Sequence, residues 1–214
     1  MVRVDRGLIA VADGMGGHDA GEVASAKVTE ALGSLPIVYG LDALVDSAVA
    51  ALQRVNQELV ALAADDASRT IGSTVVGMAL ADGRFRCFWA GDSRAYRVRN
   101  GIIEQLTRDH SLVQSLVDAG MLEPAGMEDH PNANVVTRAV GAAEQLEIDT
   151  VDGDALAGDR FLLASDGVTR LIRNEELLEQ LESGPAEEAA DRLVEMVLTR
   201  GAPDNLTFII ATIA

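Results

Sequence analysis

The sequence predicts an α+β fold in which mainly antiparallel sheets are covered by paired helices. Three observations support this. Strand-like and helix-like segments follow in the order strand, two helices, several strands with one inserted helix, two helices and a final strand. Single helices never alternate with single strands, so a doubly wound parallel sheet is disfavoured. The 214 residues are 48% apolar and show no repeat or linker, which predicts one domain with a substantial core.

The first third of the chain predicts one strand and two helices. Residues 7–12 (GLIAVA) form a short apolar run that ends at Asp13-Gly14, typical of a buried strand. Residues 20–32 and 41–64 have helical spacing. The second helix carries one apolar stripe for the core, formed by Leu44, Ala48, Ala51, Leu52, Val55, Leu59 and Leu62.

The hydrophobic period then changes to that of strands, and helices return near the end. The turn signal Asp82-Gly83 separates two strand-like runs, and the turn signal Asn100-Gly101 follows a third. A polar segment with Pro124 and Pro131, residues 121–134, predicts a loop. The predicted strands are residues 73–80, 84–90, 93–98, 159–164 and 206–213, and the predicted helices are residues 109–122, 175–182 and 186–200.

Composition limits the classes of partner. The net charge of −17 and the pI near 4.4 disfavour nucleic acid and anionic membranes, which attract clustered Lys and Arg. No apolar run approaches the roughly 18 residues needed to span a bilayer, and the N-terminus lacks a signal-peptide layout. We therefore expect a cytoplasmic monomer. The single cysteine, Cys87, lies in a strand-like run and is expected to be buried, not nucleophilic.

Aspartates stand where apolar strands end. Asp13, Asp92 and Asp166 each follow such a strand, and Asp204 stands just before the last one. Carboxylates held at the rims of sheets could converge into an all-oxygen site, which suits Mg²⁺ or Mn²⁺. The chain has too few His and Cys residues to favour a zinc site.

Asp-Gly after a strand is also an ordinary turn signal. Asp82-Gly83 and Asp152-Gly153 are expected to be turns only. At Gly14, by contrast, the glycine permits a sharp bend, and its carbonyl could itself face a metal. Spacing alone leaves the metal site and the plain turns as open alternatives.

Seven motifs occur in order along nearly the whole chain. They are VADGMGGH (residues 11–18) followed by AGEVAS (20–25), GST (72–74), AGDSRAY (90–96), LTRDHS (106–111), TRAVG (137–141), LASDG (163–167) and DNLT (204–207). Together these motifs resemble those of the bacterial members of the PPM (type-two-C) family of metal-dependent protein serine/threonine phosphatases.

This resemblance implies an α-β-β-α sandwich with a binuclear metal centre at one edge. Asp13 would bridge two Mn²⁺ or Mg²⁺ ions, and the Gly14 carbonyl would bind one of them. Asp166 and Asp204 would bind the other ion. Asp92, together with Asp166, matches the pair that holds a weaker third ion in bacterial members.

The resemblance also implies hydrolysis of phosphoserine and phosphothreonine by a metal-bridging water, in opposition to a bacterial Ser/Thr kinase. His18 is a candidate general acid, although eukaryotic relatives place the acid at the position of Met15. His110 is expected to have a structural role and His130 to be solvated. Arg94 is expected to form an internal salt bridge, and Asn205 to shape the turn that presents Asp204.

One family motif is absent. Relatives begin with a strand bearing R-x-x-N-E-D, whose arginine clamps the substrate phosphate, and neither Arg3 nor Arg6 matches it. We expect a shortened form of the domain, with a natural variant of weak activity as the alternative. Two other functions stay open: a catalytically weak or inactive module that binds phosphoproteins, and a partner-switching phosphatase of stress signalling.

Overall fold

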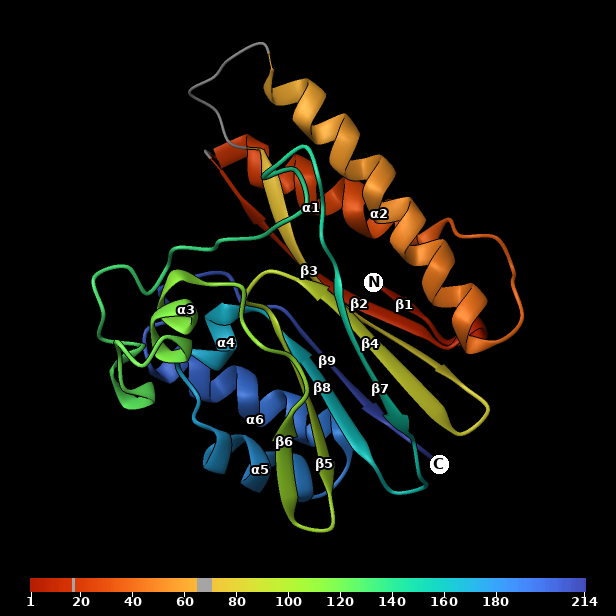
Figure 1. The fold of residues 1–214 in the computed structure, drawn as a ribbon. Helices are drawn as coiled ribbons and strands as arrows, with labels where there is room; N and C mark the ends of the chain where they lie inside the picture. Colours follow the sequence, from red (N-terminus) through yellow and green to blue (C-terminus); the bar gives the residue numbers. More distant parts are fainter. Residues whose placement is uncertain (17, 65–70) are drawn as a thin grey trace.

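The computed structural model describes residues 1–16, 18–64 and 71–214, and it contains two antiparallel sheets stacked face to face (Figure 1). The first sheet has the order β1-β2-β3-β4-β7, formed by Val2–Arg3, Leu8–Met15, Gly72–Ala81, Arg84–Ala90 and Asp149–Asp154. The second has the order β6-β5-β8-β9, formed by Ile102–Gln105, Arg94–Arg99, Arg160–Ala164 and Phe208–Thr212. Every neighbouring pair of strands is antiparallel.

Helices cover the outer face of each sheet (Figure 1). The first sheet packs against α1 (His18–Gly33) and α2 (Leu41–Ala63), and the second packs against α4 (Asp166–Thr169), α5 (Asn174–Glu182) and α6 (Ala186–Thr199). Three apolar cores result, one under each helical layer and one between the sheets. This confirms the predicted α+β fold and its α-β-β-α layers.

The core between the sheets contains Cys87, which is fully buried on β4 as expected. Burial raises the pKa of its thiol, so the thiolate is disfavoured. The core under α1 and α2 is also closely packed, because a Cβ at Gly77 on β3 would overlap the ring of Phe88. Within the described residues, no helix is long and apolar enough to cross a membrane.

The inserted helix is shorter than predicted. It runs over Leu112–Asp118 (α3), because Ser111 caps it by accepting a hydrogen bond from the Gln114 amide, while Asp109 and His110 bond elsewhere. The segment 121–134 is a loop as expected, with one 3-10 turn at Pro124–Gly126 (η2). A second such turn, Val4–Arg6 (η1), joins β1 to β2.

One predicted turn is wrong. Asp152-Gly153 lies inside β7, which pairs along β4, and Gly153 fits there because a Cβ would press on the Phe85 ring at 2.9 Å. Asp82-Gly83 is a turn as predicted, with left-handed φ angles of 53° and 71°. The hairpin turn at Asn100-Gly101 is also present, and it leads into β6, a strand that the sequence pattern did not identify.

Candidate metal centre

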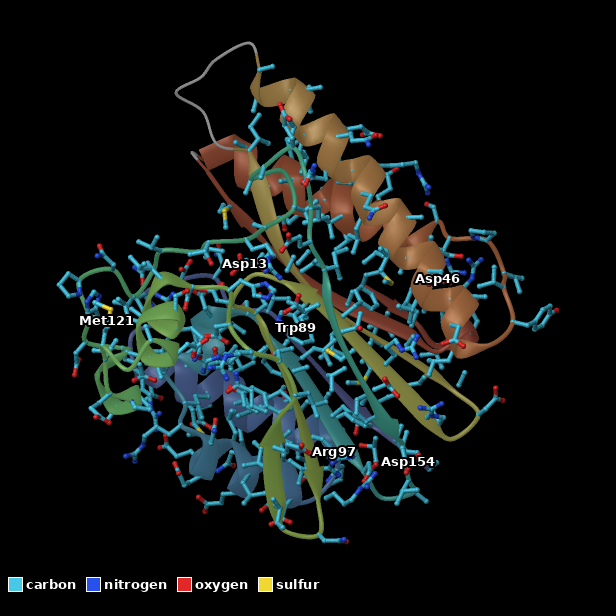
Figure 2. All side chains as sticks on the ribbon, viewed as in Figure 1. Asp13, Asp46, Trp89, Arg97, Met121 and Asp154 are labelled. Atoms are coloured by element: carbon cyan, nitrogen blue, oxygen red, sulfur yellow. The ribbon has the colours of Figure 1, made fainter. Side chains whose placement is uncertain are left out.

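Asp13 lies near the end of β2, at the end of the sandwich nearer to α3 and opposite Asp154 (Figure 2). It pairs with Thr74 on β3, and the Ser73 hydroxyl donates a hydrogen bond to the Asp13 carbonyl at 3.0 Å. Gly14 must be glycine, since a Cβ would overlap the Gly21 carbonyl on α1. The strand end is therefore fixed from two sides, and Asp13 remains only half-buried.

Asp92 follows β4 after Gly91, whose φ of 127° and contact with Thr74 exclude a larger residue. His110 holds this turn through both backbone groups of Gly91. Its amide donates to the Gly91 carbonyl at 3.0 Å, and its Nδ1 accepts from the Gly91 amide at 3.2 Å. Burial lowers the pKa of His110, so a neutral ring with a free Nδ1 lone pair is favoured.

Asp166 begins α4 directly after β8, and a turn from the C-terminal strand lies over it. Ser165 joins the two segments: its amide donates to the Thr207 carbonyl, and its hydroxyl accepts from the Thr207 amide at 3.1 Å. A Cβ on Gly167 would overlap the Asn205 carbonyl. Asp204 is exposed in this turn, and its carboxylate accepts a hydrogen bond from the Asn205 backbone amide at 2.7 Å.

The four aspartates influence one another electrostatically. Burial raises the pKa of Asp13 to about 7, and repulsion from Asp166, Asp204 and Asp92 adds to the shift. Burial and the charge of Asp166 raise the pKa of Asp92 to about 6, although Arg170 opposes that shift. Crowded carboxylates of this kind are stabilised by cations, and their oxygen atoms suit Mg²⁺ or Mn²⁺.

The arrangement fits ions that keep much of their water shell. In the described part of the chain, no three His, Cys, Asp or Glu side chains are grouped tightly enough to hold one ion by themselves. Mg²⁺ and related ions are commonly bound through one or two carboxylates plus waters, so such a group is not required. The residues could thus hold hydrated divalent ions, with Asp13 near the middle of the set.

Two hollows flank the aspartates. An open groove of about 860 Å³ is lined by Asp13, Gly14, Ser25 and the turn that contains Asn205. On the other side, a cavity of about 130 Å³ is lined by Asp92, Asp166 and Arg170 among others. The groove leaves Asp13 accessible from solvent.

The remaining predicted residues have mixed outcomes. Arg94 forms the expected salt bridge, a two-pronged pair with Asp109 at 2.7 and 2.9 Å. His130 is partly exposed in its loop and accepts from the Asn132 amide. His18 begins α1, but its side chain lies outside the part of the chain that the structure describes.

Neither Arg3 nor Arg6 contacts the four aspartates of the candidate metal centre. Arg3 bonds to Asp5 and to the Gly33 carbonyl, and Arg6 precedes the start of β2, at the end of that strand away from Asp13. Sequence reasoning also missed Arg170, which contacts two of the four aspartates. The sequence feature that could have identified Arg170 is its spacing of four residues from Asp166, which brings the two side chains to the same side of a helical turn.

Stability of the metal-free protein should fall as pH rises from about 4 to about 7. An unfolded aspartate titrates near pH 3.9, whereas folded Asp13 titrates at about 7, so the folded state holds a proton that the unfolded state releases in this window. Thermal unfolding in EDTA at several pH values measures the slope. Asp13→Asn cannot ionise and should flatten this slope, and an unchanged slope in that variant would contradict the assignment.

Comparison with known proteins connects this site to a family. Residues 2–209 match the family described as Protein phosphatase 2C. The serine/threonine protein phosphatase PstP of Mycobacterium tuberculosis is 37% identical over 96% of this chain, and the protein phosphatase PhpP of Streptococcus pneumoniae is 34% identical over 96%. The chain spans 40% of the length of PstP and 85% of PhpP.

Solved structures show the same similarity. PppA, described as a key regulatory component of T6SS in Pseudomonas aeruginosa, has a TM-score of 0.91 at 40% identity, covering 99% of this chain and 89% of its own. The catalytic domain of PstP in complex with two manganese ions has a TM-score of 0.84 at 36% identity, covering 96% of this chain and 86% of its own. The chain therefore belongs to the protein phosphatase 2C family of serine/threonine phosphatases.

Proposed function

We propose that the aspartate cluster is a binuclear centre for Mn²⁺ or Mg²⁺. Asp13 would be shared between two ions, the Gly14 carbonyl would contact one, and Asp166 and Asp204 would hold the other. The observation that carries this assignment is the placement of Asp13 at the end of β2, where Ser73 holds its backbone and an open groove reaches it. The raised pKa of Asp13, caused by burial and by three neighbouring carboxylates, supports the assignment. The two manganese ions of the PstP structure add support from a relative.

The reaction is hydrolysis of phosphoserine or phosphothreonine in phosphorylated proteins. When bound, divalent ions lower the pKa of water and neutralise phosphoryl oxygens, which makes hydrolysis feasible near neutral pH. Hydrogen bonds within the chain hold the proposed metal ligands in place. Ser73 holds the backbone of Asp13, and Ser165 holds the turn that bears Asp204. The open groove beside Asp13 receives the phosphorylated side chain. His18 remains the candidate for protonating the leaving alkoxide.

The cellular setting follows from the same function. The substrates are proteins that a Ser/Thr kinase has phosphorylated, and the phosphatase reverses the action of that kinase. The phosphatase acts in the cytoplasm and is a monomer. A net charge of −17 disfavours binding to nucleic acid or to anionic membranes. We also propose that residues 1–214 form a single phosphatase domain; no segment of this sequence matches the R-x-x-N-E-D motif.

Turnover separates this enzyme from a module that binds phosphoproteins without hydrolysing them. The names of the relatives favour the enzyme. A phosphothreonine peptide in tenfold excess over the protein, incubated with Mn²⁺, should release many equivalents of phosphate per protein. Peptide that binds but releases no phosphate would favour the module instead. A phosphotyrosine peptide of the same sequence is the specificity control and should react far more slowly.

A further inference from the structure

Arg170 places a positive charge between two of the four aspartates. It directly follows α4, one helical turn after Asp166. Its Nε lies 3.1 Å from the Asp166 Oδ2, and its Nη2 lies 3.3 Å from the Asp92 Oδ2. The guanidinium therefore bridges two carboxylates that belong to different sheets of the sandwich.

A third bond fixes this position. The Arg170 Nη2 also donates to the Ala133 carbonyl at 3.1 Å, in the loop between α3 and β7. The three partners come from the turn after β4, the start of α4 and the loop at 121–134. A planar guanidinium with several fixed donors suits such divergent acceptors better than a flexible ammonium. The contact is thus part of how these three segments meet.

The arginine is partly enclosed with its partners. The side chains of Asp92, Asp166 and Arg170 are 7%, 18% and 29% exposed. Arg170 also lowers the pKa of Asp92, against the opposing effects of burial and of Asp166. The other charged groups that line this cavity are Glu128 and the ion pair of Arg94 with Asp109. Among the described lining residues, Arg170 is therefore the cation that contacts Asp92 and Asp166.

We propose that the Arg170 guanidinium is the resident cation of the Asp92–Asp166 pair, so that this chain holds two divalent ions and excludes a third. The proposal rests on the binuclear centre argued above. It concerns the same pair to which the family resemblance assigns a third, weaker ion. An arginine in that position performs the charge neutralisation that the third ion would otherwise provide.

Charge and geometry both oppose a third ion. A divalent ion that bound both carboxylates would displace the guanidinium from two ion pairs and leave a positive charge close to the incoming one. The displaced arginine would also lose its bond to the Ala133 carbonyl. Removing the charge at position 170 should therefore open the pair to a metal, whereas a lysine should still exclude it.

The test is the stoichiometry of Mn²⁺ binding, measured by titration calorimetry and by metal analysis after equilibrium dialysis. Four proteins are compared: the unmodified chain, Arg170→Gln, Arg170→Lys and Arg173→Gln. Arg173 is a matched control, because it lies three residues on, is 77% exposed and pairs only loosely with Glu176 at 3.6 Å. Circular dichroism melts establish that each variant is folded.

We expect two ions in the unmodified chain, in Arg170→Lys and in Arg173→Gln, and a third, weaker ion in Arg170→Gln. The affinity of this third site should be on the order of tenfold or more above any residual binding in the unmodified chain. Three ions in the unmodified chain, or two in a folded Arg170→Gln variant, would overturn the proposal and leave the binuclear centre intact. No Mn²⁺ binding at all in the unmodified chain would overturn both.

Discussion

Replacing Asp166 with alanine should reduce phosphate release from a phosphothreonine peptide by about 10²–10³-fold, because the cluster then lacks a carboxylate that neutralises bound cations. Asp166 begins α4 and is close enough to Asp13 and Asp92 to raise the pKa of both carboxyls. Initial rates at saturating Mn²⁺ measure the effect. Calorimetry on the same variant should show that at least one Mn²⁺ site is lost or strongly weakened.

Asp152→Ala is the matched control for this experiment. Asp152 lies on β7 and pairs with Arg84 at 2.7 Å, with the carboxylate 45% exposed and away from the cluster. Its loss should leave both rate and Mn²⁺ binding nearly unchanged. Asp204→Ala should behave like Asp166→Ala. Full activity in both cluster variants would contradict the ligand assignment, even if the protein is a phosphatase.

Asp109→Ala should lower the free energy of unfolding by about 3–5 kcal/mol, the usual cost of leaving one partner of a buried ion pair alone. The Asp109 side chain is 5% exposed and accepts three hydrogen bonds from Arg94. Its removal leaves the Arg94 guanidinium without this partner, on a side chain that is only 20% exposed. For a chain of this length the loss corresponds to a decrease in Tm of roughly 6–20 °C. Urea unfolding followed by circular dichroism measures it.

Asp118→Ala provides the comparison, since Asp118 forms an ion pair with Arg108 in which the side chains are 40% and 63% exposed. Exposed pairs contribute about 0–1 kcal/mol, so this variant should unfold almost like the unmodified chain. Equal stability losses in the two variants would show that burial does not control the strength of the Arg94 pair.

The residues that we propose to bind metal could be singled out because each stands in a recognisable local sequence. Asp13 and Asp166 come after apolar runs that are typical of buried strands. The glycine after each is required by a backbone contact that only the structure shows. The convergence of these strand ends is a tertiary property. It became predictable only through the resemblance of the seven motifs to one family, not through spacing.

The features that the sequence did not reveal depend on long-range contacts. β7 is rich in Asp and Gly, residues with low strand propensity, and it forms a strand because its backbone pairs with β4. Arg170 resembles any surface arginine near a helix end, and its role depends on Asp92, which lies 78 residues earlier. Likewise, the sequence pattern places Asp109 at the start of a helix, but in the structure Arg94 on β5 holds Asp109 outside it.

The central claim, that the aspartate cluster makes this chain a metal-dependent phosphatase, is tested most directly by the rate of phosphate release as a function of Mn²⁺ concentration. The purified chain is stripped with EDTA, dialysed, and supplied with a phosphothreonine peptide and increasing Mn²⁺. We expect no release without metal and a saturable increase as Mn²⁺ is added. Equal release in EDTA, or none at saturating Mn²⁺ from a folded protein, would contradict the claim.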